Sequence, residues 1–152
     1  IQPAIKAAIE AVTELDLKVA LHTGGPSPKK LAQLLPYIDW IGFDIKHSPE
    51  HYPSITSVSN SGTNAWNSLR LIIESGTDYE VRTTVHWNSF TPKSLLILAN
   101  QLRSAGVTNY VIQLANSDKM LDASLGTSRP PENIDSLWEQ IGSMFANFTL
   151  RN

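Results

Sequence analysis

Apolar residues recur along the chain with the periods of helices and of short strands in turn. Ile5, Ile9 and Val12 share one side of a helix, whereas 39–46 is an apolar run of strand length. The whole pattern predicts strands at 17–22, 39–46, 79–87 and 109–115, and helices at 3–15, 28–35, from Ser61 or Thr63 to Gly76, at 92–106 and at 132–145. The segment 47–60, which holds two prolines and several serines, is a predicted loop.

This alternation predicts parallel β-α units, because parallel strands need long crossover connections. The fold class is therefore α/β, either an open doubly wound sheet or an arc of a barrel with about four strands. At 152 residues the chain suits a single domain, 1–152. It opens with a helix that no strand precedes, and with Ile in place of Met, so we expect a truncated or processed polypeptide.

The composition and net charge of the chain exclude several classes of function. Apolar residues make up 41% and charged residues 17% of the chain, which is ordinary for a soluble globular protein. A net charge of −2 gives no reason to expect nucleic acid or an anionic membrane as a partner. No apolar run has the length of a membrane span and no signal peptide is visible, so we expect a cytoplasmic protein. The chain has no cysteine, which excludes disulfides and thiolate ligation of a metal or cluster by these residues.

The predicted strands each have an apolar face and a small or polar face. In 39–46, the side chains of Ile41, Phe43 and Ile45 share one face, and Asp44 and Lys46 lie on the other. The polar side chains cluster toward strand C-terminal ends, where α/β proteins bind ligands. They suit a zwitterionic or anionic ligand, or they form an internal ion-pair network. The set comprises His22, Asp44, Lys46, Arg82, Thr84, His86 and Gln113.

Several shorter motifs lie outside the predicted strands. His47 and His51 are four residues apart, a spacing that binds metal on a helix, but Pro49 between them makes a regular helix unexpected. The run Thr-Gly-Gly-Pro-Ser at 23–27 lacks the features of a phosphate loop, so its glycines allow a tight turn or a close backbone approach. Trp87 follows a strand and is a candidate for a ligand or partner surface.

Four segments follow one another much as in radical S-adenosylmethionine activating enzymes. They are KVALHTGG, DWIGFDIKHSPEHYPSITSV, YEVRTTVHWN and NYVIQLA. The sequence resembles most the activating protein of anaerobic ribonucleoside-triphosphate reductase, and next the pyruvate formate-lyase activases. The resemblance covers about residues 1–115, and its most specific parts are the Asp-Ile-Lys at 44–46 and the Arg-Thr-Thr-Val-His at 82–86.

This resemblance implies a partial (β/α)6 barrel that binds S-adenosylmethionine beside a [4Fe-4S] cluster. Reductive cleavage of S-adenosylmethionine then gives a 5′-deoxyadenosyl radical, which removes hydrogen from a glycine of a partner glycyl-radical enzyme of the anaerobic ribonucleotide reductase type. By the same resemblance, Asp44 and Lys46 line the cofactor or a cation beside it, Thr23 lies at the same end, Arg82 helps to hold S-adenosylmethionine, and His86 lies at the substrate-side rim.

The sequence departs from the family in its cluster segment. The motifs Cys-x3-Cys-x2-Cys and Gly-Gly-Glu-Pro are absent, His22 and Gly24 replace a common Asp and Asn, and Trp87 replaces a common Pro. We therefore expect the C-terminal portion of an activase, which by itself neither binds the cluster nor makes radicals. An exposed barrel edge would favour a homo-oligomer or strand exchange.

Two other hypotheses stay open from the sequence. One is a cluster-free relative that binds a partner or a nucleotide without catalysis. The other is an unrelated half-barrel enzyme that uses His22 and His86 as acid–base groups. Cysteines encoded upstream would refute the first of these, and replacement of either histidine tests the second.

Overall fold

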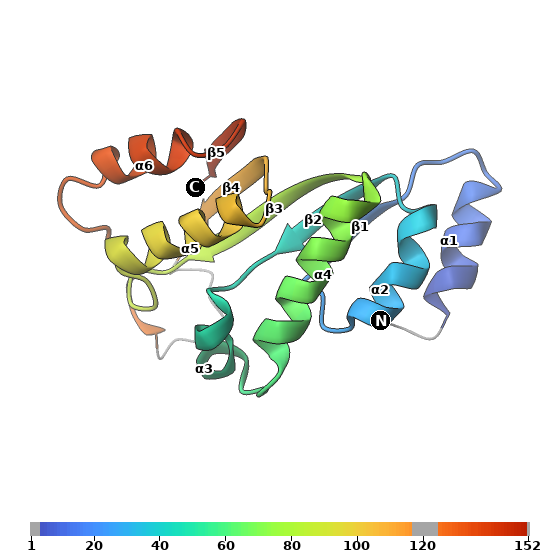
Figure 1. The fold of residues 1–152 in the computed structure, drawn as a ribbon, viewed down its shortest axis with the longest axis horizontal. Helices are drawn as coiled ribbons and strands as arrows, with labels where there is room; N and C mark the ends of the chain where they lie inside the picture. The colour runs from blue at the N-terminus through green and yellow to red at the C-terminus, as the bar shows by residue number, and fades with distance from the viewer. Residues whose placement is uncertain (1–3, 117–124, 152) are drawn as a thin grey trace. The chain divides into compact units, whose positions relative to one another are not determined.

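A computed structural model describes residues 4–116 and 125–151 of the chain. The chain forms two compact units, Ile1–Glu80 and Val81–Asn152. Figure 1 shows the helices and strands of each unit. No helix of the described residues is long and apolar enough to cross a membrane.

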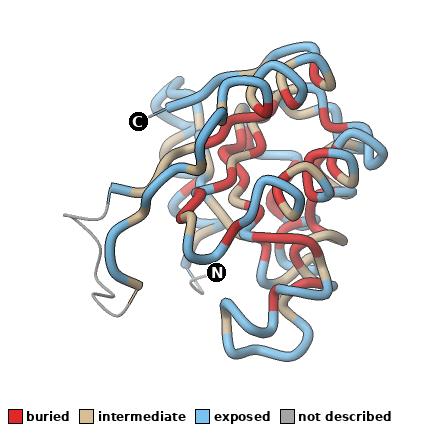
Figure 2. Tube along the Cα trace, turned by 90° about the vertical axis from the view of Figure 1, so that its left-hand side faces the viewer, coloured by how far each residue is buried: buried red, intermediate tan, exposed pale blue. Residues whose placement is uncertain are grey.

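The first unit has two parallel strands, β1 (Ala20–Thr23) and β2 (Trp40–Asp44), with Leu21 opposite Ile41 in the register. Helices α2 (Pro28–Leu34) and α4 (Ser61–Ser75) pack against each other, and α1 (Ile5–Thr13) precedes β1. Buried and exposed stretches alternate along the helical coils in Figure 2, as amphipathic helices require. The largest fully buried side chains of this unit are Leu31, Ile41, Phe43, Ile45, Leu69 and Ile72.

Between β2 and α4, the chain forms two short helical segments where the sequence predicted a loop, and a third short helical segment precedes β2. A 3-10 turn, η1 (Leu35–Tyr37), follows α2, and another, η2 (Pro49–His51), leads into α3 (Tyr52–Thr56). The loop prediction for 47–60 was therefore wrong. Pro49 and Pro53 stand at the first positions of these short helices, where proline is accepted because the N–H there has no helical partner.

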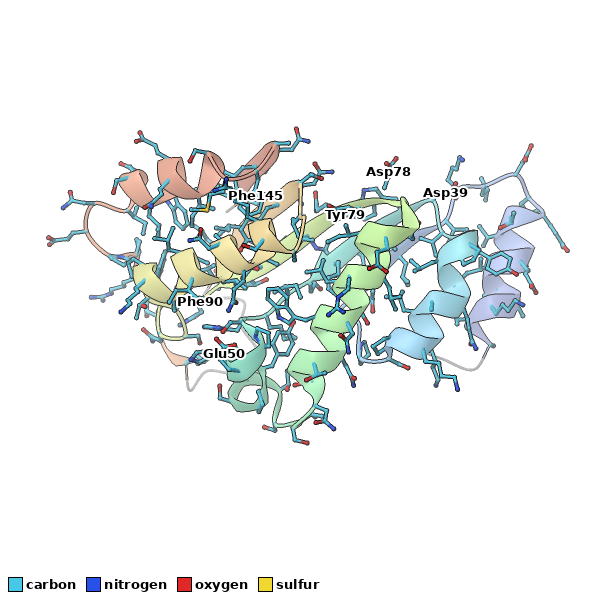
Figure 3. The ribbon with its side chains drawn as sticks, in the orientation of Figure 1. Asp39, Glu50, Asp78, Tyr79, Phe90 and Phe145 are labelled. Atoms are coloured by element: carbon cyan, nitrogen blue, oxygen red, sulfur yellow. The ribbon has the colours of Figure 1, made fainter. Side chains whose placement is uncertain are left out.

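The second unit contains three parallel strands in the order β3, β4, β5. Strand β3 (Asp78–Val85) begins at the end of the first unit and pairs with β4 (Asn109–Leu114), which pairs with β5 (Asn147–Arg151). Helices α5 (Pro92–Ser104) and α6 (Asp135–Gly142) alternate with these strands along the chain and contact each other. Phe145, labelled in Figure 3, follows α6 and packs on Tyr110 with ring centroids 4.8 Å apart.

The predicted α/β class with parallel strands is confirmed, and each predicted helix and strand is present with shifted ends. Gly76 ends α4 in the left-handed conformation, with φ +72°, as its position in the sequence predicted. Strand β5 was missed. It is short and mostly exposed, so its sequence lacks the apolar run by which the other strands were recognised.

Candidate functional site

In the first unit, the predicted residues Thr23, Asp44 and Lys46 all lie at the C-terminal ends of the two parallel strands. Thr23 is the last residue of β1 and stands opposite Phe43 in the register, next to Asp44, which ends β2. Asp44 is half-buried and Lys46 is exposed, although Ile45 between them is 1% exposed. The structure thus places these three residues where a parallel sheet presents side chains to a ligand.

A buried tyrosine holds the chain just beyond β2. The backbone N–H of Lys46 donates to the hydroxyl oxygen of Tyr52 at 2.9 Å, and Tyr52 is 2% exposed. Burial raises the pKa of Tyr52 to about 12, and the negative charge of Asp44 adds to the rise. Sequence reasoning missed Tyr52 because it lay in the supposed loop 47–60.

Gly25 makes a tight turn after β1. Its backbone N–H donates to the Thr23 hydroxyl at 3.1 Å, and its φ is +64°. A Cβ at this position would lie 2.5 Å from the Cβ of Ser68 and 2.8 Å from the ring of Phe43. The glycine is therefore required by a turn that packs against α4, one of the two roles that the sequence left open.

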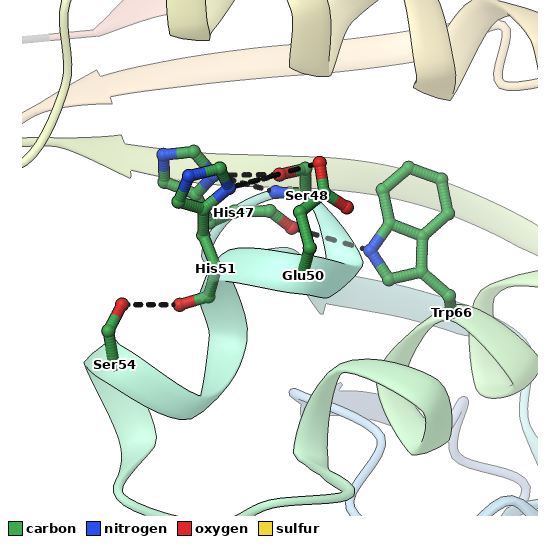
Figure 4. Close-up of polar contacts among 6 residues, drawn as sticks. All are labelled: His47, Ser48, Glu50, His51, Ser54 and Trp66. Carbon is green, nitrogen blue, oxygen red and sulfur yellow. Dashed lines mark hydrogen bonds and ion pairs between the residues drawn. The ribbon is translucent and has the colours of Figure 1, made fainter.

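His47 and His51 lie together after β2, and the Ser48 hydroxyl is within hydrogen-bond distance of Nδ1 of both rings (Figure 4). The Nδ1 atom of His47 accepts the backbone N–H of Ser48 at 2.8 Å, and the Ser48 hydroxyl lies 2.8 Å from Nδ1 of His51. The rings have centroids 4.5 Å apart, and Trp66 donates to the His47 carbonyl at 3.3 Å. The described residues contain no group of three or more potential metal-ligating side chains.

Burial lowers the pKa of His47, and the nearby His51 lowers it further, while Glu50 acts in the opposite direction. His47 is 4% exposed, and its Nδ1 is occupied by an N–H donor, so a proton on that atom would break an existing hydrogen bond. His47 is therefore a neutral, structural histidine at neutral pH.

In the second unit, the two-faced pattern of the strands is confirmed for β3, whereas in β4 Val111 is buried together with Tyr110 and Ile112. Arg82 stands beside Val111 and Thr84 beside Gln113, on the polar face. On the other face, the side chains are closed off from solvent, with exposures of 0–1%: Val81, Thr83, Val85, Tyr110 and Ile112. Burial raises the pKa of the Tyr110 phenol, which faces Thr83.

Strand β5 extends the polar face of the second unit. Thr149 stands beside Val111, and Arg151 stands beside Gln113, so both continue the rows that contain Arg82 and Thr84. These two residues were missed, because the short strand β5 lacks the long apolar run by which the other strands were recognised. Alternation of Asn147, Thr149 and Arg151 with Phe148 and Leu150 was the signal available.

His86, the predicted rim residue, lies buried in a turn directly after β3. Its Nδ1 accepts the backbone N–H of Asn88 at 3.2 Å, which leaves the proton on Nε2, and Nε2 donates to the carbonyl of Gly126 at 3.2 Å. The neighbouring Trp87 packs on Trp138 with ring centroids 5.8 Å apart, and the backbone N–H of Trp87 donates to the Ser128 hydroxyl. Both ring nitrogens of His86 are thus engaged by backbone groups. His22, by contrast, is exposed and lies edge-on to Trp40.

The residues present differ in how they fit the two expected cofactors. A [4Fe-4S] cluster does not fit, because the chain has no cysteine and the described residues gather no alternative ligand set. S-adenosylmethionine, with its carboxylate, ammonium and sulfonium groups, fits a face that offers a guanidinium, hydroxyls and an amide on adjacent strands.

Comparison with solved structures shows which fold these strands and helices make. A domain of pyruvate-formate lyase-activating enzyme from Bacteroides vulgatus matches with a TM-score of 0.70 and 14% identity, covering 96% of this chain and 88% of that one. SuiB of Streptococcus suis, solved bound to S-adenosylmethionine, matches with a TM-score of 0.62 and 11% identity, covering 97% of this chain and 34% of that one. The chain thus shares the α/β fold of these two solved structures, with parallel strands and flanking helices. No protein-family model matches the chain, and no curated protein matches it.

Proposed function

We propose that the chain is the S-adenosylmethionine-binding portion of a cytoplasmic radical S-adenosylmethionine activating enzyme. The observation that carries the proposal is the polar face of β3 and β4, where Arg82 and Thr84 stand beside Val111 and Gln113. A closed barrel fills such a face with branched apolar side chains, whereas this face offers hydrogen-bond donors near the C-terminal ends of its strands, where α/β proteins bind ligands. The likeness of fold to an activating-enzyme domain supports the same reading.

The residues of each unit have separate roles in this proposal. Arg82 pairs with the carboxylate of S-adenosylmethionine, because a guanidinium binds carboxylates through two parallel hydrogen bonds. Thr23, Asp44 and Lys46 line the cofactor at the ends of β1 and β2, and His86 holds the rim by its bonds to Gly126 and Asn88. Bound S-adenosylmethionine supplies the radical chemistry, and the chain's own residues bind and orient it.

The partner in this proposal is a glycyl-radical enzyme of the anaerobic ribonucleotide reductase type, as the motif order suggests. Because the chain has no cysteine, the cluster must be held by a polypeptide segment outside these 152 residues. The chain alone is therefore expected to bind S-adenosylmethionine weakly and to catalyse nothing.

Equilibrium dialysis of the 152-residue chain against radiolabelled S-adenosylmethionine tests the proposal. We expect saturable binding that Arg82→Gln weakens by about 10- to 100-fold, the effect of removing a charged hydrogen-bond donor. Arg103→Gln is the matched control, because Arg103 lies exposed in the last turn of α5. No saturable binding, or equal binding by the two variants, would overturn the proposal.

The absence of cysteine also favours a second candidate, a cluster-free domain that binds a nucleotide or a partner without catalysis. The two candidates differ in what the gene encodes before Ile1. A Cys-x3-Cys-x2-Cys motif there supports the activase, whereas a start codon directly before Ile1 supports the cluster-free domain.

A further inference from the structure

We propose that Tyr52 is a positioning residue of the S-adenosylmethionine site, whose buried hydroxyl fixes the backbone that carries Asp44 and Lys46. The inference rests on the proposed function and adds a residue from a helix that the sequence did not predict. Tyr52 does not itself need to touch the ligand.

The hydroxyl of Tyr52 continues the hydrogen bonding of β2 after the strand has ended. Strand β2 stops at Asp44, and two residues later the N–H of Lys46 donates to the Tyr52 hydroxyl at 2.9 Å. This partly buried backbone N–H takes its acceptor from a side chain. The Tyr52 hydroxyl therefore supplies the acceptor that the carbonyl of a neighbouring strand supplies within a sheet.

The hydrogen bond decides the direction of the Lys46 side chain. Ile45 and His47, on either side of Lys46, are 1% and 4% exposed, while Lys46 itself is exposed. In an extended segment, successive side chains point to opposite faces. With its N–H held by Tyr52 and both neighbours buried, Lys46 is held with its ammonium group on the open face.

Tyr52 is itself held in place by close packing. It is 2% exposed, and a Cβ added to Gly62 of α4 would lie 3.0 Å from the Cβ of Tyr52. The absence of a side chain at Gly62 lets η2 and α3 approach α4. Such tight contact leaves the phenol little freedom, which is what a positioning group requires.

The charge state of the phenol suits this role. Burial raises the pKa of Tyr52 to about 12, so the hydroxyl stays protonated and neutral at physiological pH. The contribution of Asp44 to that rise indicates that the Asp44 carboxylate is near the phenol. A neutral hydroxyl can accept the Lys46 N–H throughout this pH range.

Tyr52→Phe removes the hydroxyl and keeps the ring, and Tyr37→Phe is the matched control because Tyr37 is 41% exposed. We expect Tyr52→Phe to weaken S-adenosylmethionine binding by about 3- to 10-fold, the effect of one lost hydrogen bond. Tyr37→Phe should bind as the unaltered chain does. Tyr52→Phe should weaken binding of S-adenosylmethionine less in a chain that already carries Lys46→Gln than in the unaltered chain. This is expected because Tyr52 acts on the ligand through the placement of Lys46.

A second measurement uses only the unaltered chain, so it does not depend on whether a variant folds. The Lys46 amide of the unaltered chain should exchange slowly with deuterium, although Lys46 lies beyond the end of β2. Rapid exchange, or a Tyr52→Phe chain that binds as tightly as the unaltered one, would overturn the role of Tyr52 alone. If the unaltered chain shows no saturable binding, the proposed function fails, and this inference fails with it.

Discussion

The imidazole of His86 and the carbonyl of Gly126 are joined by a hydrogen bond of 3.2 Å, so the turn after β3 is tied to a segment 40 residues further along the chain. The same segment is held a second time, because the Trp87 N–H donates to the Ser128 hydroxyl at 3.0 Å. The rim of the second unit is thus held by two hydrogen bonds that join distant segments, each between a side chain and a backbone group.

His86→Ala is expected to loosen this rim. The change leaves the N–H of Asn88 and the carbonyl of Gly126 without the imidazole, which should lower the free energy of unfolding by about 1–3 kcal/mol. The Trp87 amide should then exchange faster with deuterium. His22→Ala, at an exposed position of β1, is the control. Unchanged unfolding and unchanged Trp87 exchange in His86→Ala would contradict this account of the rim.

Two glycines with the same backbone conformation should respond differently to a methyl group. Gly25 and Gly76 have φ of +64° and +72°, but a Cβ at Gly25 meets Ser68 and Phe43, and a Cβ at Gly76 meets nothing within 4 Å. We expect Gly76→Ala to cost about 1–2 kcal/mol of stability, from the left-handed conformation alone. Gly25→Ala should cost roughly 2–5 kcal/mol, because overpacking adds to that conformational cost.

Chemical denaturation of the two variants measures this difference directly. Equal losses would show that the turn after β1 can move away from α4, and the packing account of Gly25 would then be wrong.

The lowered pKa of His47 predicts a loss of stability in mild acid. The unfolded chain takes up a proton at His47 below about pH 6.5, while burial keeps the folded residue neutral to lower pH. The contribution is therefore fully present above pH 6.5, and it is lost as the pH falls through the folded-state pKa. His47→Asn removes the titration and keeps an acceptor for the Ser48 N–H.

Thermal unfolding measured from pH 7.5 down to pH 5 checks this prediction. The unaltered chain and the exposed control His22→Asn should lose stability in parallel, and His47→Asn should lose less. Parallel curves for all three proteins would mean that His47 does not titrate differently in the folded state.

Much of the fold could be predicted because its strands and helices carry clear periodicity. Val81, Thr83 and Val85 were assigned to one face of β3 by alternation alone, and all three are fully buried. Strand β5 could not be predicted, since it is exposed over most of its length and offers little apolar contrast. The short helix α3 was hidden by prolines, which break a helix in its interior but begin one at its first turn.

The candidate site was only partly predictable. Thr23, Asp44 and Lys46 lie at strand ends as the sequence indicated, because strand position follows from the chain order of β-α units. The contacts that support these residues could not be predicted from the sequence, since Tyr52 reaches Lys46 from a separate helix and the partner of His86 is 40 residues away. Binding of S-adenosylmethionine, the glycyl-radical partner and self-association through the edge of β1 stay predictions.

The central claim, that S-adenosylmethionine binds across the strand ends, is tested most directly by titrating it into the isotopically labelled chain and following the backbone amide signals. The account predicts that the amides of Arg82, Thr84 and Gln113 shift together along one saturation curve, while those on the exposed sides of α1 and α5 stay in place. An absence of saturable shifts, or shifts confined to the helices, would contradict it.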